Sequence, residues 1–243
     1  MQDERYLQLL SRKFPNAQSV VTELINLRAI LSLPKGTEHF VSDLHGEANA
    51  FIHMIKNASG VIRKKVDEAY GDSLCEEEKR ALCALIYYPD ERIDLVKRKH
   101  KGQPNNALQE GFDYSNMYEW YKRRLHQVVA IARAITIKYT RSKVYKHLPK
   151  DYAYVIKELL HESSLEQKDR QAYYNAVIEA IIETGCAEQL LISITYFIHS
   201  MAIDILHVVG DIFDRGPRPH KIVDVLSTIR DYDIQWGNHD IEW

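Results

Sequence analysis

Three short runs of β-type residues along the chain are each followed at once by Asp, Asn or His beside glycine. These are residues 39–42 before Asp43-Leu44-His45-Gly46, residues 205–209 before Gly210-Asp211-Ile212-Phe213-Asp214-Arg215-Gly216, and residues 234–236 before Gly237-Asn238-His239-Asp240. In an open α/β sheet, ligands bind in the crevice at the carboxyl ends of parallel strands. Glycine lets the backbone turn sharply there, so that the side chains can converge. The pattern therefore predicts an α/β fold with a site at one edge of a sheet.

Helical periodicity dominates the stretch between the first and second runs. Its four apolar stripes are Leu82, Leu85 and Ile86; Tyr121, Leu125, Val128, Val129, Ala132 and Ile135; Tyr152, Ile156, Leu159 and Leu160; and Tyr174, Val177, Ile178, Ile181 and Ile182. Candidate capping boxes begin at Ser73 and Ser164, and glycine, proline and asparagine predict a long loop over residues 101–117. We expect residues 59–199 to form an all-helical insert. Residues 1–58 and 200–243 would then form the sheet-bearing core.

Helices also flank the three predicted strands. Apolar spacing predicts helix over residues 4–33 and again over residues 47–57. Pro217 and Pro219 predict the start of a third helix, because proline suits the first helical turn. A helix that begins just after a ligand loop presents backbone N–H groups that favour anions.

The composition is that of an ordinary soluble protein. Hydrophobic residues make up 45% and charged residues 27%, with a net charge of −2. This charge gives no reason to expect nucleic acid as a partner, and no apolar run reaches membrane-spanning length. The N-terminus lacks a signal-peptide pattern, and three cysteines are most simply read as reduced thiols. We therefore expect a cytoplasmic protein.

The residue types after the predicted strands suggest metal-dependent phosphoryl chemistry. Carboxylate, amide and imidazole groups together suit divalent ions of intermediate hardness. Two such ions about 3.5–4 Å apart form a clamp for in-line attack on phosphorus. We expect Asp43, His45 and Asp211 to bind one ion, and Asp211 and Asn238 the other, with Asp211 as the bridge.

Three further residues are candidates for catalysis. Asp214 can orient His239 and fix its tautomer, and His239 can then protonate the departing oxygen. Arg215 offers a bidentate grip on a phosphoryl group. We therefore expect Asp214, Arg215 and His239 to act on the substrate.

The three motifs D-x-H-G, G-D-x-x-D-R-G and G-N-H-D, in this order, resemble the metal-binding signature of the calcineurin-like metallophosphoesterases. Residues 34–46, 233–240 and 139–144 are similar, more specifically, to class 3 fructose-1,6-bisphosphatase. The resemblance implies a metallophosphoesterase-type sheet and a bacterial gluconeogenic enzyme that uses Mn²⁺. Its implied reaction is hydrolysis of the 1-phosphate of fructose 1,6-bisphosphate. Such a substrate carries a second phosphate that needs a cationic grip, for which Arg141 and Lys143 are candidates.

The sequence departs from that family in one respect. Family members continue well beyond the G-N-H-D motif, and the superfamily takes further metal-binding histidines from the later part. The resemblance thus implies an incomplete sheet and an incomplete second metal site. We therefore expect a truncated and inactive N-terminal portion of the enzyme.

Two alternatives stay open at this point. The chemistry could serve a phosphoprotein or dinucleotide polyphosphate phosphatase, because two of the motifs do not distinguish these substrates. The chain could instead be a non-catalytic module whose helical insert serves assembly or regulation. Whether it forms a homo-oligomer also stays open.

Overall fold

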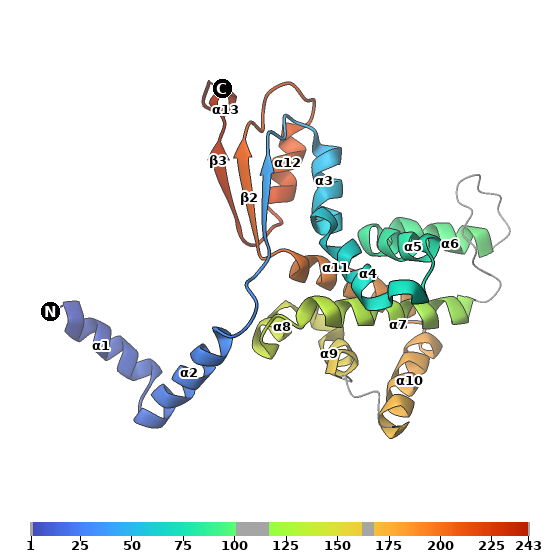
Figure 1. Ribbon diagram of the computed structural model, residues 1–243, viewed down its shortest axis with the longest axis horizontal. Helices are drawn as coiled ribbons and strands as arrows, with labels where there is room; N and C mark the ends of the chain where they lie inside the picture. Colours follow the sequence, from blue (N-terminus) through green and yellow to red (C-terminus); the bar gives the residue numbers. More distant parts are fainter. Residues whose placement is uncertain (1, 101–116, 162–167, 243) are drawn as a thin grey trace.

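The computed structural model describes residues 2–100, 117–161 and 168–242. A three-stranded parallel sheet lies at one end of the molecule (Figure 1), with strand order β1-β2-β3. Its strands are β1 (Glu38–Ser42), β2 (Ile205–Gly210) and β3 (Tyr232–Trp236). The register pairs Phe40 with His207, and His207 with Asp233. The predicted α/β class is confirmed, and all three polar motifs follow strands that end at the same edge.

One face of the sheet carries the smaller of two hydrophobic clusters. The helices α3 (Ala48–Asn57) and α12 (Pro219–Leu226) lie side by side on this face (Figure 1). Buried members of the cluster are Val41, Leu44, Ala48, Phe51, Leu206, Val208, Ile212, Ile222 and Leu226. Alternation along β1 leaves Phe40 70% exposed on the opposite face. Within the described residues, the sheet is therefore packed on one side only.

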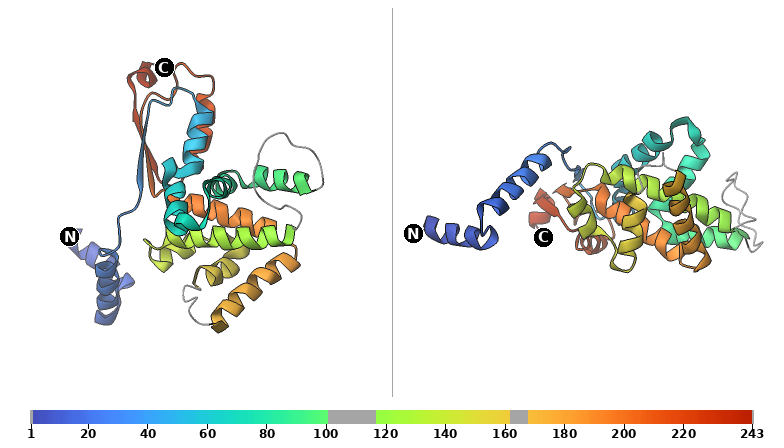
Figure 2. Two further views of the ribbon diagram at one scale, coloured as in Figure 1. Left: turned by 45° about the vertical axis from the view of Figure 1, so that its right-hand side comes forward. Right: turned by 90° about the horizontal axis from the view of Figure 1, so that it is seen from below.

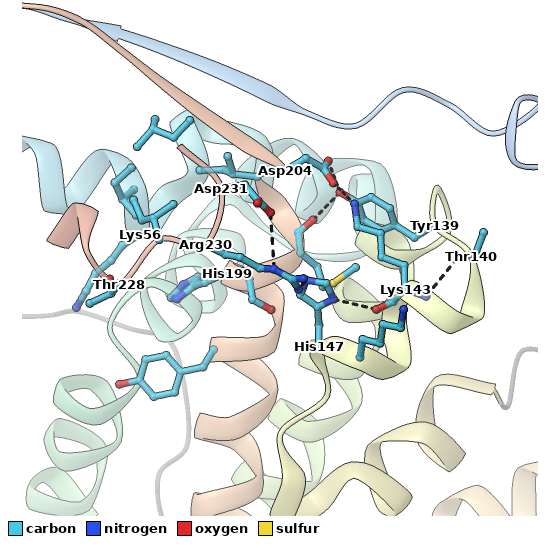
Figure 3. A pocket seen from close by; sticks show the side chains of 18 of the residues that line it. Lys56, Tyr139, Thr140, Lys143, His147, His199, Asp204, Thr228, Arg230 and Asp231 are labelled. Carbon is cyan, nitrogen blue, oxygen red and sulfur yellow. Dashed lines mark hydrogen bonds and ion pairs between the residues drawn. The ribbon is translucent and has the colours of Figure 1, made fainter. Parts of the chain in front are cut away.

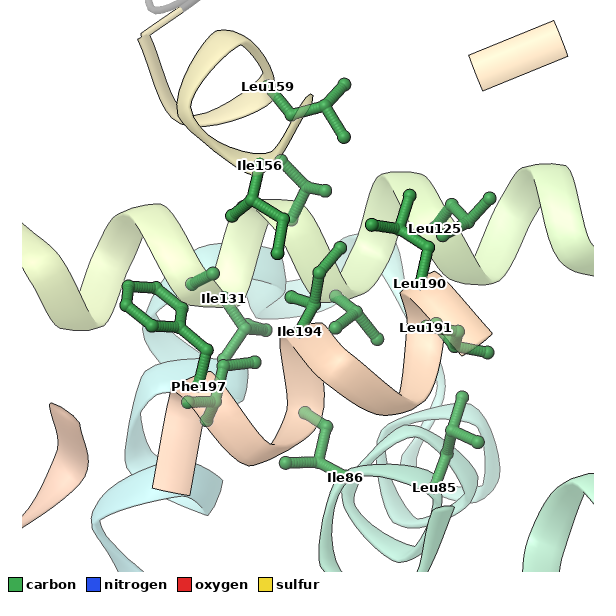
Figure 4. Close-up of a cluster of buried hydrophobic side chains, with 14 of the residues drawn as sticks. Leu85, Ile86, Leu125, Ile131, Ile156, Leu159, Leu190, Leu191, Ile194 and Phe197 are labelled. Atoms are coloured by element: carbon green, nitrogen blue, oxygen red, sulfur yellow. The ribbon is translucent and has the colours of Figure 1, made fainter. Parts of the chain in front are cut away.

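The described part of residues 59–199 is helical and contains no strand, as expected. Its elements are η1 (Ala58–Gly60), α4 (Val61–Tyr70), η2 (Gly71–Ser73), α5 (Glu76–Tyr87), α6 (Pro89–His100), α7 (Met117–Thr136), α8 (Arg141–His147), η3 (Lys150–Tyr152), α9 (Ala153–His161), α10 (Lys168–Glu183) and α11 (Ala187–Ala202). The helices α7 and α11 pack along each other at the centre, with Leu125 and Ile131 facing Leu190 and Ile194 (Figure 4). This second cluster matches the predicted stripes, whereas the exact division into core and insert stays a prediction.

Two local predictions in the insert have other outcomes. The capping box predicted from Ser73 is wrong: α5 begins at Glu76, and Cys75 is its N-cap, with the Glu78 carboxylate accepting the Cys75 N–H at 3.3 Å. Ser73 belongs to η2, where its hydroxyl donates to the Tyr70 carbonyl. The box predicted from Ser164 and most of the predicted loop, residues 101–116, lie outside the described residues.

The first two helices stand apart from the rest of the molecule. They are α1 (Gln2–Lys13) and α2 (Ala17–Ile30), and both extend away from the body in each view (Figures 1 and 2). Asn16 interrupts the predicted continuous helix, because its side chain accepts the Ser19 N–H as an N-cap. Apolar residues on these helices are exposed: Tyr6, Leu7, Leu9, Val20, Val21, Leu24, Ile25, Leu27 and Ile30. Apolar spacing thus predicted these helices correctly. Their apolar residues, however, are not buried against any described part of the chain.

None of the described helices combines the length and the apolar content that a membrane crossing requires.

Candidate metal centre

The loops after β1 and β2 continue side by side beyond the strands. The Asp43 N–H donates to the Val209 carbonyl at 3.0 Å, and the His45 N–H donates to the Asp211 carbonyl at 3.0 Å. The Gly46 N–H then donates to the Ile212 carbonyl at 2.8 Å. These bonds hold Asp43 and His45 next to Asp211, although 168 positions separate Asp43 from Asp211 along the chain.

Two of the expected ligands adopt an unusual backbone conformation. Asp43 has φ 52° and His45 has φ 44°, in the left-handed region that side chains normally avoid. Each residue in this conformation lowers stability by roughly 1 kcal/mol or more, and it persists only where surrounding contacts hold the backbone in place. The paired loop backbone supplies those contacts here, so two of the predicted ligands are held in a strained conformation.

Potential ligand atoms form two groups that share one residue. Atoms of Asp43, His45 and Asp211 all lie within 4.8 Å of one another, and so do atoms of Asp211, Asp214 and His239. Asp211 is 7% exposed and belongs to both groups. A ligand that bridges two ions requires this shared position.

Glycines make room for the two central carboxylates. A Cβ at Gly210 would overlap an Asp43 carboxylate oxygen, and a Cβ at Gly237 would overlap one of Asp211. The glycine that begins each of these two motifs is therefore needed for the close approach of a carboxylate that follows the neighbouring strand. This reason is separate from the turn geometry that the sequence suggested.

The third loop joins the other two through backbone and side-chain contacts. The His239 N–H donates to Asp211 Oδ1 at 3.0 Å. Asn238 is the exposed first residue of α13 (Asn238–Glu242), and its role as a ligand stays a prediction. The Asp240 carboxylate accepts the N–H groups of Ile212 at 2.9 Å and Phe213 at 3.0 Å. Sequence reasoning gave Asp240 no role, although it is the last residue of the third motif.

Asp214 pairs with a different histidine from the one expected. Its Oδ1 meets Nδ1 of His45, whereas the expectation was a contact with His239. Burial acts to raise the pKa of Asp214, but the hydrogen bond and charge of His45, with Arg215, lower it overall below its ordinary value. Asp214 therefore orients His45 here, because the loops after β1 and β2 are adjacent.

Arg215 follows Asp214 and reaches outward. Its Nε lies 3.0 Å from Asp214 Oδ2, while its side chain is 71% exposed. Because Nε is held by Asp214, the remaining N–H groups of the exposed guanidinium can contact a bound phosphoryl group. This position is compatible with the predicted grip on substrate.

The donor set fits divalent cations. Carboxylates of Asp43, Asp211 and Asp214 converge with the imidazoles of His45 and His239. Carboxylates this close repel one another, and divalent cations bound between them would relieve that repulsion. Mixed oxygen and nitrogen donors suit several such metals, so the residues support a metal centre without selecting the ion.

The structure does not bring the two predicted phosphate contacts of the insert to this centre. Lys143 Nζ lies 2.5 Å from Asp204 Oδ1, and Asp204 directly precedes β2. Asp211 directly follows β2, a strand of six residues, so the two ends are about 20 Å apart. Arg141 is the exposed first residue of α8, the helix that carries Lys143. The role of Arg141 and Lys143 as substrate contacts therefore stays a prediction.

Comparison with known proteins adds evidence from the whole sequence. The family model described as Firmicute fructose-1,6-bisphosphatase matches residues 5–243. The chain is 50% identical over 242 residues, 100% of its length, to the class 3 fructose-1,6-bisphosphatase of Phocaeicola vulgatus. The corresponding proteins of Bacteroides thetaiotaomicron and Clostridium botulinum are 50% and 48% identical over 99% and 98% of the chain. The chain spans 34% of the length of each of these relatives. No solved structure matches it.

Proposed function

The chain belongs to the Firmicute fructose-1,6-bisphosphatase family, and we propose that the whole protein hydrolyses fructose 1,6-bisphosphate to fructose 6-phosphate and phosphate. The observation that carries this proposal is the position of Asp211 in both groups of potential ligands. The names of the relatives give the substrate. We further propose a metallophosphoesterase-type fold, Mn²⁺ as the metal and a cytoplasmic, gluconeogenic role in a bacterium.

The described residues divide between two metal positions. Asp43, His45 and Asp211 would hold one ion, while Asp211 and Asn238 would serve the other, with Asp214 and His239 close by. When bound, such ions polarise the phosphoryl group, lower the pKa of water and offset developing negative charge. The chain's part in this is to keep the carboxylates convergent through the paired loops after β1 and β2.

Other groups of the chain act on the substrate itself. Arg215 contacts the phosphoryl oxygens, since its guanidinium is exposed beside Asp214. His239 donates a proton to the sugar oxygen as the phosphorus–oxygen bond breaks, so that fructose 6-phosphate leaves as a neutral alcohol at that position. The hydrogen bond from the His239 N–H to Asp211 fixes the backbone position from which the His239 side chain extends.

A comparison of substrates tests this function. The protein, in a form that continues past residue 243 as its relatives do, is supplied with Mn²⁺ and with fructose 1,6-bisphosphate, a phosphopeptide or a diadenosine polyphosphate. We expect release of phosphate from the sugar bisphosphate in clear preference. Preferred turnover of either other substrate would support a phosphoprotein or dinucleotide polyphosphate phosphatase instead.

One observation favours an additional role in assembly. The exposed apolar residues of α1 and α2 form a surface that single soluble proteins seldom leave uncovered. We propose self-association into a homo-oligomer, with no role for nucleic acid given the net charge of −2.

The alternative of a non-catalytic module for assembly or regulation has a separate test. A chain that binds metal but shows no turnover of any substrate would favour it.

A further inference from the structure

A cavity of about 710 Å³ lies where the insert meets the amino ends of the strands. Side chains from α3, α8, α11 and the segment before β3 surround it (Figure 3). Its volume is within the usual range for small-molecule sites. The cavity lies beside Asp204, which precedes β2, and is therefore at the opposite end of that strand from Asp211.

Cationic groups outnumber carboxylates around this cavity. Its lining includes the side chains of Lys56, Lys143, Lys146 and Arg230, against those of Asp204 and Asp231. The Asp204 carboxylate already has partners. Asp204 accepts the Thr37 N–H at 2.6 Å and the Tyr139 hydroxyl at 2.5 Å, as well as pairing with Lys143.

Two of these cations are available to a ligand. Arg230 and Asp231 are 3.8 Å apart and both largely exposed, so their pairing contributes little. Arg230 also lies 3.2 Å from the His147 ring (Figure 3). Among the described residues, Lys146 makes no ion pair or hydrogen bond.

A histidine also lines the cavity. The Nε2 atom of His199 has no hydrogen-bond partner among the described residues. Burial, together with the charge of Lys56, lowers the pKa of His199 to about 4. The ring is therefore neutral near pH 7 and adds no charge to the cavity.

Residues 34–38 and 139–144, which belong to two of the family-like segments, meet beside the cavity and lie outside the metal centre. Residues 34–38 contribute the Thr37 N–H, and residues 139–144 contribute Tyr139 and Lys143, all to the carboxylate of Asp204. Lys138, next to the second segment, also lies 3.5 Å from Asp204. Asp204 thus fixes the insert against the start of β2 and forms one wall of the cavity.

We propose that this cavity is a second ligand site, separate from the metal centre, that binds a small phosphorylated metabolite. Lys146 and Arg230 hold the phosphate, with Lys56 nearby. The apolar side chains of Ile55 and Met201 contact the remainder of the ligand. A concave site with an excess of cations favours a compact polyanion, whereas an extended nucleic acid requires a basic surface stripe.

Pyrophosphate binding to metal-free protein tests the proposal. The 243-residue chain is stripped of metal by a chelator, dialysed and titrated with inorganic pyrophosphate in a calorimeter at pH 7.5. Without metal, the centre at Asp43, Asp211 and Asp214 repels anions, so the cavity is the expected binding site. Because neither metal nor turnover is involved, the result is independent of the proposed phosphatase activity.

Variants locate the binding. We expect Lys146→Gln and Arg230→Gln each to weaken binding about tenfold, as for the loss of one charge-assisted contact. Lys64→Gln, a matched loss of charge at a 77% exposed position on α4, should leave binding unchanged. Matching circular dichroism spectra check that the variants are folded.

Two outcomes would overturn the proposal. One is wild-type protein that does not bind pyrophosphate. The other is binding that neither cavity variant weakens, or that Lys64→Gln weakens equally, since the anion would then be held by general surface charge. The two cavity variants lie on separate segments, so poor folding of one leaves the other decisive.

Discussion

The carboxylate of Asp240 accepts the backbone N–H of Ile212 at 2.9 Å and so ties the third ligand loop to the second. The same carboxylate accepts the Phe213 N–H at 3.0 Å. These bonds span the segment that begins with Asp211. Asp240 therefore acts on the metal centre through the backbone that carries Asp211 and Asp214.

Replacing Asp240 by alanine should weaken metal binding. Asp240→Ala removes both acceptors and frees the loop, and loss of supporting groups around a metal typically lowers affinity about 10- to 100-fold. Mn²⁺ titration followed by electron paramagnetic resonance measures the change. Asp240→Asn keeps one acceptor oxygen and should fall between wild type and Asp240→Ala. Equal Mn²⁺ affinity in all three proteins would show that Asp240 does not support the metal centre.

Asp204 should be important for folding stability. Its side chain is 11% exposed and pairs with Lys138, which is also largely buried. Asp204→Ala leaves that lysine without its partner, which typically costs about 3–5 kcal/mol. Urea unfolding gives the free energy of unfolding. The matched control is Asp224→Ala, which removes an exposed pairing with Lys221 and should cost about 0.5 kcal/mol or less. Similar losses for the two variants would contradict a structural role for Asp204.

Stability should fall with acid through the titration of His199. Its pKa is about 4 in the folded chain, against an ordinary value of 6.5, because burial and the charge of Lys56 disfavour protonation. A hydrogen bond with the Ile86 backbone acts in the opposite direction and raises the pKa, but it does not offset them. The unfolded chain thus binds the proton first as pH falls from 6.5 towards 4, and stability is lost over that window.

Unfolding at two pH values isolates this contribution. Between pH 7.5 and pH 5, wild type should lose about 1–2 kcal/mol more stability than His199→Gln, which cannot titrate. His39 and His126 also have lowered pKa values, but they are present in both proteins and cancel. An equal acid loss in wild type and His199→Gln would show that this buried ring does not govern the effect.

The arm formed by α1 and α2 should promote self-association. Ile25 is 64% exposed in the middle of its apolar surface, and such surfaces mark contact sites between proteins. Sedimentation velocity should show a larger species for wild type that Ile25→Lys reduces. Ile137→Lys, at an exposed position away from the arm, is the control. A monomeric wild-type chain would contradict this expectation.

Local patterns predicted the elements and part of the site. Each strand has its β-type run, and each ligand motif follows its strand directly, so the convergence of Asp43, His45 and Asp211 followed from parallel pairing alone. The partner of Asp214 could not be predicted in this way. Three loops meet within a few ångströms, and only the packed structure decides that His45 is nearer than His239.

The position of the helix that carries Lys143, relative to the sheet, also could not be predicted from the sequence. Lys143 lies on a helix whose position depends on Asp204, 61 residues further along the chain. That contact places Lys143 at the amino end of the strands, whereas its predicted role as a phosphate contact requires a position near the carboxyl end. A periodic pattern reports which residues share a helix face, but not which end of the sheet the helix approaches.

The most direct test of the account is Mn²⁺ binding by the 243-residue chain with and without the shared carboxylate. Wild type, Asp211→Asn and the surface control Asp224→Asn are titrated with Mn²⁺, and free metal is read by electron paramagnetic resonance. If Asp211 joins both groups of ligands, its loss of charge should lower affinity at least about tenfold, since the bound ion is held chiefly by the carboxylates. Asp224→Asn should bind as wild type does. Undiminished Mn²⁺ affinity in Asp211→Asn would contradict the central claim that these strand ends form a metal centre around Asp211.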